Sequence, residues 1–188
     1  MKTGKAQPAG QELDIYMLGS AGLFGACILS VRKENELLAR FRTSFVKETA
    51  GLIRTLPDIR AARAAYRNGA VCVQMLGEDG VFAGLWRLAE SLHCGLETDL
   101  RRIPVRQETI EICEFFGLNP YELHSGGSFL AAAAKPELFV SAMEKRGLVP
   151  EYIGHTTGGN DRIVQNRDIR RYLTRPEGGR HVCGNNPA

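Results

Sequence analysis

The sequence is short of the features that mark specialised classes of protein. Aromatic residues make up 7% of the 188 residues and there is a single tryptophan. No run of about 18 apolar residues occurs, so a membrane-spanning helix is not expected. The first ten residues are polar, which argues against a secretory signal. Neither sign of charge dominates, and a net charge of +3 does not by itself indicate a nucleic-acid-binding protein.

The 44% share of hydrophobic residues is typical of a soluble globular chain with one ordinary domain or two small ones. The five cysteines form no CxxC pair and lie at no zinc-finger spacing from a histidine, so no structural metal is expected. Free thiols of this kind are typical of a cytoplasmic protein. The cysteines are Cys27, Cys72, Cys94, Cys113 and Cys183.

Hydrophobic periodicity predicts strands and helices in irregular order, which favours an α/β (α+β) fold with a mixed sheet flanked by helices. The predicted strands are 13–18, 70–75, 96–100, 129–134, 149–156 and 162–164. The predicted helices are 23–31, 34–41, 44–53, 57–68, 81–92, 107–116 and 136–146. We expect a disordered head over 1–12, a domain over 13–175 and a flexible tail over 176–188.

Helix 81–92 has the clearest amphipathic pattern in the chain. Trp86 lies beside Phe82 and Leu85 on its apolar face, so we expect the indole to be largely buried. Pro57 is predicted to be the first residue of helix 57–68, with Asp58 in the positively polarised first turn of that helix.

Three glycine loops at strand ends are candidates for binding an anion, because glycine lets backbone N–H groups approach a ligand. Ser125-Gly126-Gly127-Ser128 has no acidic residue and is the better phosphate candidate. In Gly77-Glu78-Asp79-Gly80, Glu78 and Asp79 would repel a phosphate unless a metal intervened. The third loop is Thr156–Asn160. None of these loops matches GxGxxG or the Walker pattern, and all three can also be ordinary turns.

The histidines and arginines give weaker signals. His124 and His155 each border a hydroxyl residue, which allows an acid/base role or a structural one. Arginines cluster at 101–106 and again over 162–180, where they are typical of solvated faces. RNA binding by the C-terminal arginines is an alternative that the scarcity of interleaved aromatic residues makes less favoured.

A longer pattern carries a resemblance to a known superfamily. Its motifs are Leu18-Gly-Ser-Ala-Gly-Leu-Phe-Gly, Gly80-Val-Phe-Ala-Gly-Leu-Trp-Arg, Ile103-Pro-Val-Arg-Gln-Glu, Ser125-Gly-Gly-Ser-Phe-Leu and Ile153-Gly-His-Thr-Thr-Gly-Gly-Asn-Asp. Together they resemble the C-terminal domain of the aminoimidazole ribonucleotide (AIR) synthetase superfamily, in particular its hydrogenase-maturation-like, synthetase-related branch. The resemblance covers residues 13–175.

The resemblance implies a mixed sheet flanked by helices, without the N-terminal domain that supplies most of the ATP and magnesium site in full members. The chain also departs from the superfamily loop Asp-x-Thr-x-Gly-Gly, since Met75, Gly77 and Asp79 stand at its Asp, Thr and first Gly positions. A C-terminal cysteine carries the reacting group in the maturation protein, but Cys183 is followed by five more residues, and we expect it to be a free thiol.

We therefore expect a C-terminal-type domain that acts as a binding or assembly module, is inactive alone and holds phosphate weakly at Ser125–Ser128. The catalytic residues remain unknown at this stage, and no metal or cofactor is expected for the chain alone. The alternative is one half of a split ATP-dependent enzyme, in which a separate N-terminal-domain partner brings ATP and magnesium. A homodimer is the other partner considered.

Overall fold

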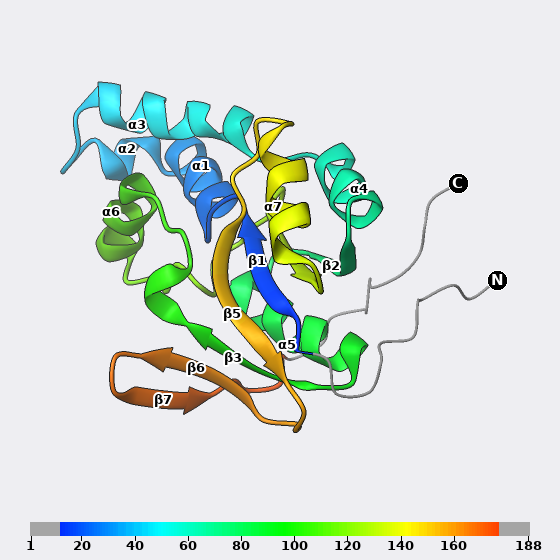
Figure 1. Cartoon of the computed structure of the whole chain (residues 1–188). Helices are drawn as coiled ribbons and strands as arrows, with labels where there is room; N and C mark the ends of the chain where they lie inside the picture. The colour runs from blue at the N-terminus through cyan, green and yellow to red at the C-terminus, as the bar shows by residue number, and fades with distance from the viewer. Residues whose placement is uncertain (1–11, 177–188) are drawn as a thin grey trace.

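A computed structural model of the chain describes residues 12–176, in which seven strands form one sheet surrounded by helices (Figure 1). All but the first residue of the predicted tail, Cys183 included, and all but the last residue of the predicted head lie outside the described residues. The strands are β1 (Asp14–Leu18), β2 (Ala70–Met75), β3 (Gly95–Asp99), β4 (Phe129–Ala133), β5 (Glu151–Thr157), β6 (Arg162–Asn166) and β7 (Ile169–Tyr172). The helices are α1 (Leu23–Arg32), α2 (Glu34–Leu37), α3 (Thr43–Gly51), α4 (Ile59–Arg67), α5 (Gly80–Leu92), α6 (Gln107–Phe116) and α7 (Pro136–Glu144), with 3-10 turns η1 (Leu52–Thr55) and η2 (Leu100–Arg102).

The sheet is mixed, and its strand order is β2-β4-β1-β5-β3-β6-β7. β4 is antiparallel to β1 and β2, β5 is antiparallel to β1 and β3, and β3 is parallel to β6. Strands β1, β2, β3 and β6 therefore run in one direction, and their C-terminal ends meet at the same edge of the sheet. This arrangement confirms the predicted α/β class with helices on a mixed sheet.

Residues along β1 and β4 alternate between two apolar clusters, because successive side chains of a strand point to opposite faces. Ile15 and Met17 of β1 lie in the cluster that includes α5, whereas Tyr16 and Leu18 lie in the cluster that includes α4 and α7. These strands are therefore buried on both faces, which explains why β4 is a continuous apolar run rather than an alternating one.

A third cluster covers the edge of the sheet where β1, β2 and β3 end. It joins Ala26 of α1, Leu37 of α2, Val46 of α3 and Ile112 of α6. In Figure 1 these four helices form a group at the top of the molecule, above the sheet. The helices of this cluster therefore form a layer next to this edge of the sheet.

The structure corrects the expectation about Asp58 and describes the surroundings of Trp86 more closely. Asp58 is the N-cap of α4 rather than part of its first turn, and its carboxylate accepts a hydrogen bond from the backbone N–H of Ala61. Trp86 is half-buried: its Nε1 is enclosed in the protein, and the guanidinium of Arg162 covers its ring, 3.9 Å from the centroid.

Strand β7 was not predicted from the sequence. Its four residues are all exposed and include two arginines. A strand that pairs on one side with β6 and buries no side chain shows none of the periodicity on which sequence prediction depends. Within residues 12–176, no helix has the length and apolar character needed to cross a membrane.

Candidate functional site

The fold brings two of the three candidate loops together. Gly77–Gly80 follows β2, and Ser125–Ser128 precedes β4, the antiparallel neighbour of β2. The backbone N–H of Ser125 donates to the carbonyl of Gly77, at 2.9 Å, so the two loops are directly bonded. Thr156–Asn160 connects β5 to β6 at the opposite edge of the sheet, and it cannot share a site with them.

Both serine hydroxyls of the Ser125–Ser128 turn are fully buried and hydrogen-bonded to the chain. The Ser128 hydroxyl accepts from the N–H of Ser20, at 3.0 Å, and donates to the Ser20 carbonyl. The Ser125 hydroxyl accepts from the N–H of Gly22, at 2.8 Å, and donates to the Leu123 carbonyl. The two side chains therefore hold the turn after β1, and they offer no free donor to a ligand.

The glycines between them retain free polar groups. The N–H groups of Gly126 and Gly127 have no hydrogen-bond partner within residues 12–176, and both residues are half-buried. Gly127 has a φ of +83°, a conformation that side-chain-bearing residues rarely adopt. The space next to these glycines is narrow, because a Cβ on Gly126 would lie 2.7 Å from Nε2 of His124. The turn can thus present two adjacent N–H donors to a small anion.

The segment before this turn caps two helices. The carbonyl of Tyr121 accepts from the N–H of Val81, at 2.7 Å, in the first turn of α5. The carbonyl of His124 accepts from the N–H of Gly25, at 2.8 Å, in the first turn of α1. Donors that helix N-termini often offer to phosphate are therefore satisfied here by the protein itself.

The acidic loop is only partly available for a cation. Asp79 forms an ion pair with the guanidinium of Arg87, which is buried, whereas Glu78 is exposed. The described residues contain no group of three or more histidine, cysteine, aspartate or glutamate side chains that could hold a metal ion. The loop therefore offers a cation two carboxylates at most, and that of Asp79 is already paired with Arg87.

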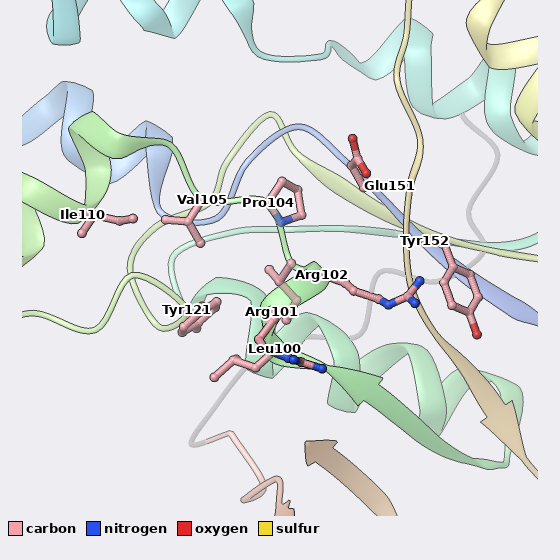
Figure 2. Close-up of a pocket in the computed structure, with 10 residues that line it drawn as sticks. Leu100, Arg101, Arg102, Pro104, Val105, Ile110, Tyr121, Glu151 and Tyr152 are labelled. Carbon is pink, nitrogen blue, oxygen red and sulfur yellow. The ribbon is translucent and has the colours of Figure 1, made fainter. Parts of the chain in front are cut away.

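A groove of about 590 Å³ opens at the same edge of the sheet (Figure 2). Its residues are Leu100, Arg101, Arg102, Ile103, Pro104, Val105, Ile110, Tyr121, Glu151 and Tyr152. The carbonyl of Pro104 accepts from the N–H of Ala21, at 2.8 Å, and from the Ser20 hydroxyl. The groove is therefore joined through the turn after β1 to the Ser125–Ser128 turn.

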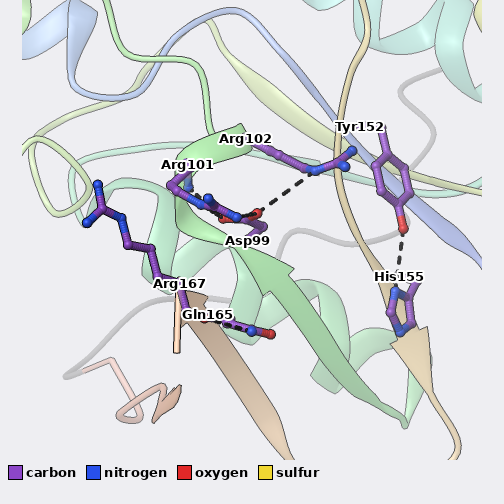
Figure 3. Close-up of polar contacts among 7 residues, drawn as sticks. All are labelled: Asp99, Arg101, Arg102, Tyr152, His155, Gln165 and Arg167. Carbon is purple, nitrogen blue, oxygen red and sulfur yellow. Dashed lines mark hydrogen bonds and ion pairs between the residues drawn. The ribbon is translucent and has the colours of Figure 1, made fainter. Parts of the chain in front are cut away.

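Charged residues on one rim of the groove are held by Asp99 (Figure 3). Asp99 accepts two side-chain hydrogen bonds from Arg101, at 3.1 and 2.9 Å, and lies 4.0 Å from Nε of Arg102. The bonds from Arg101 hold the pKa of the Asp99 carboxyl below its usual value. The guanidinium of Arg102 lies 5.2 Å from the ring centroid of Tyr152, on the other side of the groove.

This groove was not predicted from the sequence, because its residues come from separated segments and match no motif. Arg101 and Arg102 were expected on a solvated face, and they are indeed largely exposed, yet they also line the groove. The segment 100–106 reads Leu-Arg-Arg-Ile-Pro-Val-Arg, and this mixture of apolar and basic residues is the one local feature that fits a groove with a charged rim.

The side chains of His124 and His155 contact aromatic and acidic residues of the fold. The ring of His124 packs against Phe24, with 4.4 Å between centroids. Nδ1 of His155 lies 3.4 Å from the Tyr152 hydroxyl, and its Nε2 lies 3.5 Å from a carboxylate oxygen of Glu12. Neither imidazole lies in a hydrogen bond with a serine, threonine or cysteine side chain among the described residues, so the geometry does not point to a nucleophile pair.

The arginines near the C-terminal end of the described chain are also engaged in part. Arg162 stacks on Trp86, and Arg170 forms an ion pair with Glu97, at 2.9 Å. The first contact fastens the β6–β7 hairpin to helix α5, and the second fastens it to strand β3.

Comparison with known proteins identifies the class of this domain. The family described as AIR synthase related protein, C-terminal domain, matches residues 11–166, and the chain belongs to this family. The superfamily resemblance predicted from the motifs is thereby confirmed.

Individual relatives are hydrogenase-maturation proteins. The chain is 27% identical over 158 residues to carbamoyl dehydratase HypE of Rhizobium leguminosarum bv. viciae, which covers 80% of the chain and 42% of that protein. The crystal structure of E. coli HypE has a TM-score of 0.66 at 17% identity, over 93% of this chain and 52% of that one. A HypE–HypF complex gives a TM-score of 0.65 at 15% identity, over 91% and 55%. The chain thus spans about half the length of the relatives it matches.

Proposed function

We propose that this domain is a ligand-binding or assembly module that does not complete an ATP-dependent active site by itself. Its ligand site would be the Gly126–Gly127 backbone, which takes a phosphate group weakly. The proposal also includes the cytoplasmic location expected from the free cysteines. Cys27, Cys94 and Cys113 are free thiols.

The observation that carries the phosphate site is the pair of N–H groups without partners on a turn that has no acidic side chain. Two amide donors can hold one phosphate oxygen or two. Because the neighbouring hydroxyls and helix N-termini are already bonded within the protein, few further donors reach the ligand. We therefore expect a dissociation constant in the millimolar range, about 4 kcal/mol of binding free energy.

An NMR titration of the full chain with inorganic phosphate, and separately with ATP, tests this site. The amide signals of Gly126 and Gly127 should shift, and the shifts should disappear in Gly126→Val. An Arg171→Ala variant is the control, because this exposed arginine lies on β7, at the far edge of the sheet. Shifts confined to residues 167–175, or no shifts at all, would leave the turn with a structural role only.

A second candidate function is one half of an ATP-dependent enzyme. The observation in its favour is that the chain spans 42% of HypE from Rhizobium and 52% of HypE from E. coli, while its described residues hold no metal cluster. On this alternative, an N-terminal-domain protein would supply the ATP and magnesium ligands that the superfamily resemblance implies.

Reconstitution distinguishes the two functions. A purified N-terminal domain of a HypE-like protein from the same cell would be mixed with this chain, and magnesium-dependent ATP hydrolysis would be measured. Turnover that appears only in the mixture supports the split enzyme. Turnover that is the same with and without this chain, together with phosphate-induced shifts at Gly126, supports the binding module.

A further inference from the structure

The exposed face of α4 combines arginine and apolar side chains. Ala62 and Ala65 are buried against the sheet, and the helix packs beside α7 (Figure 1). The remaining arc of the helix carries Arg60, Arg63 and Arg67, together with Ile59 and Tyr66, which are 51% and 52% exposed.

Helical spacing sorts these residues into two adjacent stripes. Ile59 and Tyr66 are seven residues apart, and so are Arg60 and Arg67; residues at this spacing lie above one another after two turns. Arg63 lies between the two pairs on the helix surface. The result is an apolar stripe two turns long, bordered by a stripe of positive charge.

The charge on this face is largely uncompensated. Residues 53–68 contain four arginines and one acidic residue, Asp58, which pairs with Arg60 at 2.9 Å and caps the helix. Arg54, Arg63 and Arg67 form no ion pair with any residue of the described chain.

We propose that this surface, defined as Ile59, Arg60, Arg63, Tyr66 and Arg67, docks an acidic amphipathic segment of a partner protein. The free arginines select acidic side chains, which steer the encounter and set the register. Ile59 and Tyr66 supply the apolar contact that a partner segment can desolvate, and arginine and tyrosine are both enriched at protein interfaces.

The same composition disfavours the other polyanions. Single-stranded nucleic acid is held by rows of aromatic side chains, and Tyr66 is the sole aromatic residue of 53–68. A membrane-surface helix needs a broad apolar face directed to the lipid, but the alanine face of α4 is already buried in the protein.

Fluorescence anisotropy on the full chain tests the docking surface. The probe is a labelled synthetic peptide with two leucines seven residues apart, the spacing of Ile59 and Tyr66, flanked by glutamates. We expect binding that weakens as salt is raised, and that falls at least about tenfold in Arg63→Glu with Arg67→Glu. Ile59→Ser with Tyr66→Ser should weaken it as well.

Matched controls carry the same changes elsewhere on the surface. Arg171→Glu with Arg175→Glu changes two exposed arginines, and Leu138→Ser with Val149→Ser changes two residues that are 65% and 68% exposed. Both controls should bind the peptide like the unaltered chain. Absence of peptide binding, equal losses in the controls, or tighter binding to an RNA oligonucleotide or to phosphatidylserine vesicles would each overturn the proposal. None of these results bears on the Gly126–Gly127 site.

Discussion

The Ser128 side chain joins two turns from a fully buried position. Ser128→Ala would leave the N–H of Ser20 without its acceptor in the interior. A buried donor that loses its partner costs about 1–3 kcal/mol, so we expect the free energy of unfolding to fall by that amount. Urea denaturation followed by circular dichroism measures it.

Ser141→Ala is the control for this change, because Ser141 lies on the exposed side of α7. Its effect should stay within about 0.5 kcal/mol. If Ser128→Ala were as stable as Ser141→Ala, the hydrogen bonds between the Ser128 hydroxyl and Ser20 would not stabilise the fold. The Ser128 hydroxyl would then count as a donor available to a ligand.

The thiol of Cys113 should not react with alkylating reagents in the folded protein. It is 2% exposed, and burial raises the pKa of its thiol to about 11. At about pH 8, iodoacetamide should therefore alkylate Cys113 in urea but not in the native protein, as mass spectrometry of its peptide would show. Half-buried Cys72 is the comparison, and equal native labelling of both would contradict the assigned burial.

The same shift has a pH consequence with a defined sign. The folded state disfavours the Cys113 thiolate, while the unfolded thiol ionises near its ordinary pKa of about 8.5. The contribution of this residue to stability is therefore complete below that pH and declines as the pH rises above it.

Helix α5 begins against the segment that closes the sheet edge, and Gly80 makes this contact sterically feasible. Gly80 has a φ of +70°, and a Cβ there would overlap the carbonyl oxygen of Tyr121. Gly117, which ends α6, has nearly the same φ, +66°, but open space beside it. Gly117→Ala should thus cost only the strain of the left-handed conformation, about 1–2 kcal/mol. Gly80→Ala should cost more.

Thermal unfolding of the two variants separates these contributions. The difference in unfolding free energy between Gly80→Ala and Gly117→Ala measures the overlap with Tyr121, because backbone strain is common to both. Equal losses would show that α5 does not start against the Tyr121 carbonyl.

Elements with strong local signals could be predicted from the sequence, and those held by tertiary contacts could not. The span of α6 was predicted correctly because its amphipathic run ends at Gly117, a residue suited to positive φ. Strand β2 was also predicted with its observed bounds. Strand β7 was missed because pairing with β6, rather than burial, defines it.

The candidate site was predictable in part for the same reason. A glycine turn at a strand end is visible in the sequence, so Ser125–Ser128 and Gly77–Gly80 could be selected. Their direct contact follows only from the antiparallel pairing of β2 with β4. The burial of both serine hydroxyls depends on Ser20 and Gly22, more than 100 residues away, and no local pattern encodes it.

The molecule considered whole is a C-terminal AIR synthase-related domain about half as long as the HypE proteins it matches. Its edge loops are closed by their own hydrogen bonds, and Asp79 is neutralised by Arg87. Phosphoryl transfer needs metal ions and positive groups placed around the phosphates, and residues 12–176 contain no cluster of three or more histidine, cysteine, aspartate or glutamate side chains that could hold a metal ion.

Steady-state ATP hydrolysis by the purified full chain, with magnesium and without any partner, tests the central claim most directly. We predict phosphate release at the background rate, unchanged in Glu78→Gln and in Asp79→Asn. Magnesium-dependent turnover by the unaltered chain that disappears in either variant would contradict the account, because it would show that this domain alone holds a working ATP site.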